Sequence, residues 1–207
     1  MPDYPLNRYE SQIRTYEKRD SVAPPTKGRT LFVGSSSISF WKTLDADLAP
    51  LPVLNRGFGG STTPELTYYC SRIILPYEPK IVMIYAGEND FGSAKPITPA
   101  QVALAYKELV TAIQKRLTTS RIGFISIKPS PSRWSRWPRM QEANRLIQEY
   151  VQTDKRLFYV DVSQAMLGPN GRPRPELFLA DSLHMTPKGY QLWTERIRPV
   201  VQQMAAK

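Results

Sequence analysis

Short apolar runs alternate with helical patterns along most of this 207-residue chain, and this alternation constrains the fold more than any other feature. Five runs rich in Ile, Val, Phe and Leu are typical of strands buried on both faces, at residues 29–33, 52–55, 80–85, 121–127 and 156–162. Strands that alternate with helices form a parallel sheet with helices on both faces. Its carboxyl edge, where ligands bind in such sheets, is where we expect the chemistry.

Three segments carry strong helix signals. Residues 99–118 place apolar side chains at helical spacing, and Thr62-Thr63-Pro64-Glu65 combines a capping box with an early proline. Thr186-Pro187 predicts the start of the last helix, with Thr as N-cap and Pro in the first turn. Residues 140–150 are predicted to form a further helix between the fourth and fifth strands.

The chain is long enough for one domain with a full apolar core. The first 25 residues are charged and end in Ala23-Pro24-Pro25. We therefore expect residues 1–28 to form an N-terminal helix and linker packed on a single domain, residues 29–207. The first residues show no signal-peptide pattern, and the sequence leaves localisation and oligomeric state open.

Composition excludes several classes of site. The single cysteine, Cys70, excludes an internal disulfide or a cysteine-rich zinc site, and the single histidine, His184, excludes a histidine-rich metal site. The formal net charge is +10, but the basic residues are scattered and no zinc-finger, RNP or KH pattern accompanies them. We expect no nucleic-acid partner and, because every apolar run is short, no transmembrane segment.

Polar residues follow the strands at four places. Gly34-Ser35-Ser36-Ser37, a glycine-rich stretch ending in Gly60-Ser61 and Gly87-Glu88-Asn89-Asp90 follow the first three, and Asp181-Ser182-Leu183-His184 precedes the last helix. Each alone has a structural explanation, such as a serine cap or an Asx turn. Together they supply a hydroxyl, a histidine with a carboxylate three residues before it, and candidate oxyanion donors, which is the inventory of an acyl-transfer site.

In order and spacing, these four blocks resemble the SGNH, or GDSL-type, ester hydrolases, and within them the platelet-activating-factor acetylhydrolase-like branch. The resemblance implies a flavodoxin-like α/β/α sandwich with a five-stranded parallel sheet. It also implies Ser36 as nucleophile, His184 as base and Asp181 as its supporting acid, with no metal or organic cofactor. The implied oxyanion hole consists of Ser36, Gly60 and Asn89. One departure is that the usual Gly-Asp-Ser has become Gly34-Ser35-Ser36, which removes a side chain expected to support the turn.

The resulting hypothesis is a serine hydrolase of a carboxylic ester, either a small molecule or a carbohydrate. Short loops indicate a shallow crevice and therefore a short acyl group such as acetyl. The loop at 128–138 supplies Arg133 and Trp134 as substrate contacts, with a packed cover over the core as the alternative. Asp90 is a rival to Asp181 as the acid. The alternative function is a non-catalytic flavodoxin-like module that binds an anion or a nucleic acid without turnover.

Overall fold

Five parallel strands form one sheet in the order β2-β1-β3-β4-β5. This is the strand order of flavodoxin-like doubly wound folds, so the computed structural model, which describes residues 4–92 and 96–206, confirms the predicted fold class. The strands lie close to the five apolar runs of the sequence: β1 (Thr30–Gly34), β2 (Val53–Gly57), β3 (Ile81–Tyr85), β4 (Arg121–Ile125) and β5 (Leu157–Val160).

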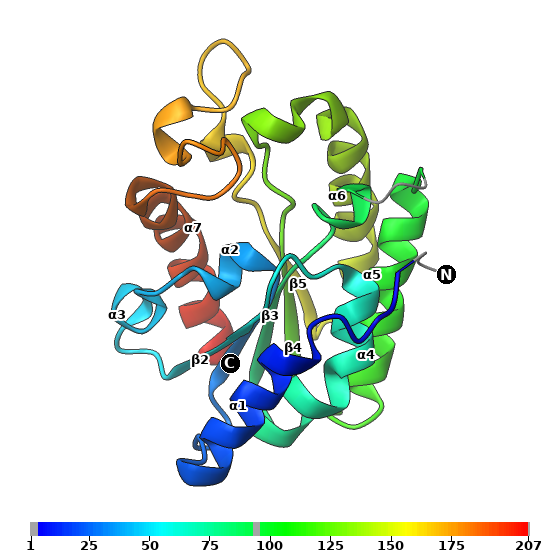
Figure 1. Ribbon diagram of the computed structural model, residues 1–207, viewed down its shortest axis with the longest axis vertical. Helices are drawn as coiled ribbons and strands as arrows, with labels where there is room; N and C mark the ends of the chain where they lie inside the picture. The colour runs from blue at the N-terminus through cyan, green and yellow to red at the C-terminus, as the bar shows by residue number, and fades with distance from the viewer. Residues whose placement is uncertain (1–3, 93–95, 207) are drawn as a thin grey trace.

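Helices cover both faces of the sheet (Figure 1). One face carries α1 (Glu10–Val22), α4 (Thr63–Ile73), α5 (Pro99–Gln114) and α6 (Trp137–Val151), and the other carries α2 (Ser36–Ser39), α3 (Leu44–Leu48) and α7 (Pro187–Ala205). Short 3-10 helices complete the connections: η1 (Leu75–Tyr77), η2 (Asp90–Gly92), η3 (Pro131–Arg136), η4 (Gln164–Met166) and η5 (Pro175–Leu177). No helix within residues 4–92 and 96–206 is long and apolar enough to cross a membrane.

The core lies on both sides of the sheet because successive side chains of a strand point to opposite faces. In β1, Leu31 and Val33 pack on the side of α4 and α5, whereas Phe32 packs on the side of α7. In β3, Ile84 packs on the side of α4 and α5, and Met83 packs on the side of α7. All five side chains are completely buried, as the continuous apolar runs indicated.

The end of β1 turns sharply because Gly34 has no side chain. Gly34 has a φ of 148°, and a Cβ at this position would lie 2.1 Å from the carbonyl oxygen of Tyr85. In the parallel register, Gly34 is level with both Gly57 of β2 and Tyr85 of β3. The chain segments that leave these three strands therefore begin side by side at the carboxyl edge.

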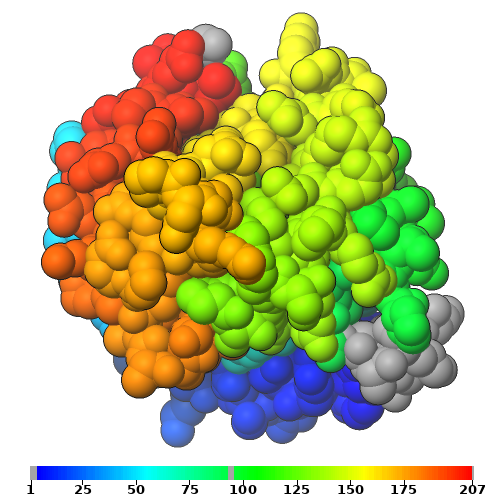
Figure 2. Space-filling model, turned by 90° about the horizontal axis from the view of Figure 1, so that it is seen from above, coloured from blue at the N-terminus to red at the C-terminus, as the bar shows by residue number. Residues whose placement is uncertain are grey.

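Segments that follow β4 and β5 meet above this edge. Seen from above in Figure 2, the orange segment after β5 lies against the yellow-green segment after β4. Between them, the backbone N–H of Ser132 in η3 donates to the carbonyl of Ser182 at 3.0 Å. The two segments that carry Arg133 and His184 are thereby held together.

Candidate active site

Ser36 is the accessible member of the three consecutive serines. Ser35 and Ser37 are buried, with 2% and 3% of their surface exposed, whereas Ser36 is half-buried at the first turn of α2. The turn is held by backbone contacts, because Ser35 N–H donates to the Tyr85 carbonyl at 3.2 Å and the Ser35 carbonyl accepts from Ile38 N–H at 2.9 Å. These bonds hold the turn in a chain that lacks the usual aspartate.

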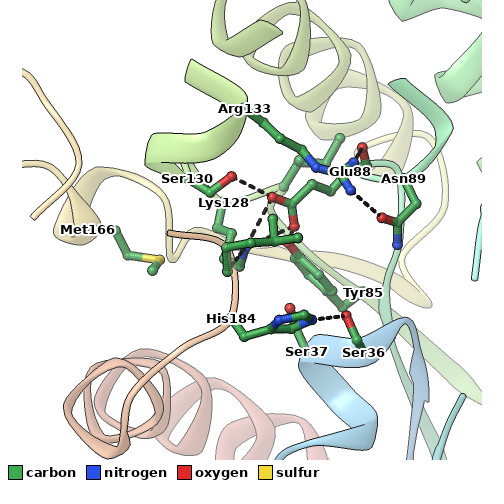
Figure 3. Close-up of polar contacts among 12 residues, drawn as sticks. Ser36, Ser37, Tyr85, Glu88, Asn89, Lys128, Ser130, Arg133, Met166 and His184 are labelled. Carbon is green, nitrogen blue, oxygen red and sulfur yellow. Dashed lines mark hydrogen bonds and ion pairs between the residues drawn. The ribbon is translucent and has the colours of Figure 1, made fainter. Parts of the chain in front are cut away.

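His184 lies beside the Ser36 hydroxyl (Figure 3). Its Nε2 is 3.0 Å from Ser36 Oγ, and its Nδ1 is 2.5 Å from Asp181 Oδ2. The loop before α7 therefore brings the imidazole across the top of the sheet to α2. With a carboxylate on Nδ1, the ring is oriented so that Nε2 can accept a proton from the hydroxyl.

Asp181 is fixed and charged. Its Oδ1 accepts hydrogen bonds from the backbone N–H groups of Leu183 at 3.0 Å and His184 at 2.9 Å. The hydrogen bond from the His184 side chain, aided by these two N–H groups, lowers the pKa of Asp181 to about 2. The Asp181 carboxylate therefore stays ionised well above about pH 2, where it can stabilise an imidazolium.

Asp90, the rival acid, is engaged elsewhere. It is 3% exposed, and its carboxylate accepts from the backbone N–H of Thr63 at 3.1 Å, at the start of α4. Burial raises the pKa of Asp90 to about 6 despite this hydrogen bond. In the structure, the imidazole of His184 is therefore paired with Asp181 and not with Asp90.

Asn89 and Gly60, from the segments that follow β3 and β2, lie next to each other. Asn89 is half-buried after β3, and its Nδ2 donates to the Ser61 carbonyl at 3.2 Å. A Cβ placed on Gly60 would lie 3.7 Å from that same Nδ2, so the glycine loop passes close to the amide. The structure brings the two predicted oxyanion donors next to each other.

The N-terminal segment contacts the glycine loop, which the sequence did not reveal. Tyr9 and Gln12 accept hydrogen bonds from the loop through their side chains: Gly60 N–H donates to the Tyr9 hydroxyl and Gly59 N–H to Gln12 Oε1, each at 3.0 Å. The Tyr9 ring packs edge-on against Phe58, with centroids 5.5 Å apart. In this structure the N–H of Gly60 is thus bound to Tyr9.

A buried ion pair lies beneath the site, between Glu88 and Lys128 (Figure 3). The side chain of Lys128 is 0% exposed and that of Glu88 is 5% exposed, with Nζ 2.9 Å from Oε2. Tyr85 and Ser130 also donate to the Glu88 carboxylate, at 2.8 and 2.7 Å. Burial favours the neutral carboxyl, but the charges of Lys128 and Arg133 and the hydrogen bonds from Lys128 and Ser130 together outweigh it and lower the pKa of Glu88.

Lys128 also connects this pair to the histidine loop. Its Nζ donates to the carbonyl of Leu183 at 2.9 Å, one residue before His184. One ammonium group therefore holds the segment after β3 and the segment before α7 together. One sequence signal pointed to this pair, a glutamate and a lysine that follow adjacent strands. That signal does not predict burial, because long charged side chains are rarely buried.

The loop expected to contact the substrate is packed over the site. Trp134 stacks on Trp137 with ring centroids 6.2 Å apart, and the guanidinium of Arg172 lies 5.0 Å from the Trp134 ring centre. Arg133 points toward the segment after β3 and binds the Glu88 carbonyl and the Asn89 side chain. A substrate contact by Arg133 or Trp134 stays a prediction.

Sequence reasoning missed two residues near His184 whose side chains are apolar and exposed. Phe40, 48% exposed, has its ring centre 4.9 Å from that of His184. Leu179, also 48% exposed, donates its backbone N–H to the His184 carbonyl at 2.8 Å. Cys70 is buried, and burial raises the pKa of its thiol to about 11. Its thiol is therefore protonated at neutral pH and is a poor nucleophile.

Comparison with solved structures shows the same fold in microbial proteins. A protein from Streptococcus pneumoniae described as a platelet activating factor aligns with a TM-score of 0.81 at 18% identity, covering 94% of each chain. An acylhydrolase from Bacteroides fragilis gives 0.78 at 21% identity, covering 98% of this chain and 99% of its own. An acetyl-xylooligosaccharide esterase from Geobacillus gives 0.66 at 14%, covering 87% and 95%.

No curated protein matches the sequence significantly. Residues 26–192, however, match the profile of the family described as GDSL-like lipase/acylhydrolase, which spans every strand and all four polar blocks. The chain therefore belongs to the GDSL-like lipase/acylhydrolase family and is a carboxylic ester hydrolase.

Proposed function

We propose that the protein hydrolyses a short-chain carboxylic ester through a Ser36–His184–Asp181 triad. The observation that carries the proposal is the contact of 3.0 Å between Ser36 Oγ and His184 Nε2, with Asp181 on the opposite ring nitrogen. At 3.0 Å, the imidazole nitrogen is close enough to remove the proton of the serine hydroxyl.

In the proposed reaction, Ser36 Oγ attacks the ester carbonyl carbon while His184 Nε2 takes the hydroxyl proton. The tetrahedral intermediate collapses, the alkoxy C–O bond breaks, and His184 returns the proton to the departing alcohol. A water molecule then gives a proton to His184 and attacks the acyl-enzyme, which releases the carboxylic acid and restores Ser36. Asp181 keeps its negative charge throughout, in agreement with its lowered pKa.

The oxyanion of the intermediate is assigned to Ser36 N–H, Gly60 N–H and Asn89 Nδ2. The proximity of Gly60 to Asn89 Nδ2 supports this assignment. Each donor of this kind is typically worth about 3–4 kcal/mol in the transition state. Because Gly60 N–H donates to Tyr9 in the structure, binding of a substrate oxygen there requires Tyr9 to give up that hydrogen bond.

The acyl group is proposed to be short, as in an acetyl ester of a carbohydrate or a small alcohol. The Geobacillus relative, which acts on acetyl-xylooligosaccharides, supports this class. The exposed ring of Phe40 beside His184 offers an apolar surface on which the alcohol portion can rest. Aromatic faces of this kind also pack against the apolar faces of sugar rings.

The test is turnover of p-nitrophenyl acetate, butyrate and octanoate by the wild-type protein and by Ser36→Ala, His184→Ala and Asn89→Ala. We expect kcat/KM to be highest for acetate. Each substitution should lower kcat by about 10²-fold or more while the melting temperature stays within a few degrees. Full activity in Ser36→Ala would refute the triad, and a preference for octanoate would refute the short acyl group.

A further inference from the structure

Arg133 links two consecutive residues at the end of β3. Its Nη1 donates to the Glu88 carbonyl at 2.6 Å, and its Nη2 donates to the Asn89 carboxamide oxygen at 2.9 Å. Arg133 comes from η3, after β4, so the contact spans 44 positions in the sequence. Figure 3 shows the guanidinium directed at this segment.

This contact determines which way the Asn89 carboxamide faces. A guanidinium has only hydrogen-bond donors, so it can bind the amide oxygen but not the amide nitrogen. The hydrogen bond of the amide nitrogen requires the same orientation, because Nδ2 donates to the Ser61 carbonyl, which can only accept. The nitrogen is thereby turned toward Ser61 and Gly60. It carries two hydrogens, and the bond to Ser61 uses one of them.

Without Arg133, the carboxamide would lose that orientation. The terminal torsion of asparagine is broad and roughly two-fold, so the oxygen and nitrogen could exchange places. An oxygen in the place of Nδ2 would repel a developing oxyanion instead of stabilising it. A cation on the amide oxygen also polarises the group and makes its N–H a stronger donor, as in other charge-assisted hydrogen bonds.

The anchor of Arg133 is itself rigid. The Glu88 carbonyl that Arg133 binds belongs to a residue whose side chain is buried and held by Lys128, Ser130 and Tyr85. The segment of η3 that carries Arg133 is fixed by its own N–H to the Ser130 carbonyl, at 3.1 Å. The guanidinium therefore joins two well-held backbones, with Asn89 between them.

We propose that Arg133 is a positioning residue of the oxyanion hole, which acts through Asn89 by holding and polarising its carboxamide. This inference rests on the proposed function and deepens it. It differs from the expectation that Arg133 binds the substrate itself. The two roles make different kinetic predictions, because a direct contact contributes to substrate binding whereas a positioning residue affects the transition state through its partner.

The experiment is a double-mutant cycle with Arg133→Met and Asn89→Ala, measured as kcat and KM for p-nitrophenyl acetate. Arg133→Met should lower kcat by about 10- to 100-fold and change KM by less than about two-fold. In the Asn89→Ala background, Arg133→Met should cause no further loss, because the residue it acts through is gone. Arg133→Lys should recover part of kcat, since one donor can still reach the amide oxygen.

Two controls separate positioning from a general loss of charge or of structure. Arg136→Met removes a positive charge from the same 3-10 helix and should leave kcat unchanged. The side-chain NH₂ signals of Asn89 in an NMR spectrum of ¹⁵N-labelled protein should shift or broaden in Arg133→Met and not in Arg136→Met. Arg133→Gln serves as a second variant if Arg133→Met does not fold.

Losses that multiply in the double variant, or a rise in KM with unchanged kcat, would overturn the proposal and assign Arg133 to the substrate. Either result would leave the esterase intact. A wild-type protein that neither hydrolyses the ester nor reacts at Ser36 would refute the proposed function, and the role of Arg133 with it. Unchanged Asn89 signals in Arg133→Met would also contradict the proposal.

Discussion

His184 Nε2 lies 3.0 Å from Ser36 Oγ, although the two residues are 148 positions apart in the sequence. The parallel sheet accounts for this proximity, because it gathers the ends of its strands at one edge. Ser36 follows β1 directly, and His184 precedes α7, which packs beneath α2 on the same face. The fold thus supplies the geometry that a serine hydrolase needs.

Replacement of Asp181 by Asn should lower kcat for p-nitrophenyl acetate by about 10²- to 10⁴-fold. The amide cannot stabilise an imidazolium, and it permits the wrong tautomer of His184. The change is measured by steady-state kinetics alongside Asp45→Asn, which removes an exposed carboxylate from α3 and should leave kcat unchanged. Near-wild-type activity of Asp181→Asn would show that another group supports the histidine.

Removal of the Tyr9 hydroxyl should increase activity. Tyr9→Phe keeps the ring against Phe58 but releases the N–H of Gly60 for the substrate oxyanion. A neutral hydrogen bond has a net value of about 0.5–1.5 kcal/mol, so kcat/KM should rise roughly two- to tenfold. Tyr16→Phe, which removes a hydroxyl of α1 that donates to the Gly57 carbonyl, is the control and should not raise kcat/KM. A fall in Tyr9→Phe would exclude competition at Gly60.

Most of the fold, and which candidate site residues lie close together, could be predicted from the sequence. The alternation of apolar runs and helices fixes the layers, and the residues after the strands then share one edge, so Ser36, Asn89 and His184 were expected together. Each of these residues lies in a short block whose neighbours, such as Gly34, also constrain the backbone.

Contacts between elements whose docking has no local signature could not be predicted. Tyr9 on Gly60 depends on how α1 lies against the glycine loop, and nothing in the pattern of the first 25 residues sets that angle. Lys128 looks like a surface residue after a strand, because its burial depends on Glu88, 40 positions away. Arg133 was noticed as a cation near the crevice, but its partner is a protein side chain.

Loss of the buried ammonium of Lys128 should destabilise the protein. Lys128→Met leaves the Glu88 carboxylate buried without its counter-charge, which costs about 3–5 kcal/mol in the free energy of unfolding. Urea denaturation measures the change. Lys27→Met breaks the exposed pair with Glu78 and should cost less than about 1 kcal/mol. Adding Glu88→Gln to Lys128→Met should recover part of the loss, and no recovery would argue against an uncompensated charge.

The stability of the protein should depend on the titration of Asp90. Burial raises the pKa of Asp90 in the folded state from 3.8 to about 6, so between these values the folded state binds a proton that the unfolded state has lost. This contribution is greatest at low pH and is lost as the pH rises through about 6. The unfolding free energy of the wild type should therefore fall by about 2 kcal/mol relative to Asp90→Asn between pH 4 and pH 7.

Urea denaturation at several pH values gives the unfolding free energies of the wild type and of Asp90→Asn. Subtracting one from the other removes the contribution of every titratable group that the two proteins share. Parallel curves for the wild type and Asp90→Asn would show that Asp90 titrates alike in the folded and unfolded states.

Reaction with a fluorophosphonate, followed by peptide mapping with mass spectrometry, tests the triad most directly. The serine oxygen displaces fluoride from phosphorus only when a base removes its proton. We predict one modified residue, Ser36, with no adduct in Ser36→Ala and a much slower reaction in His184→Ala. An adduct that persists in Ser36→Ala, or that maps to Ser35 or Ser37, would contradict the account.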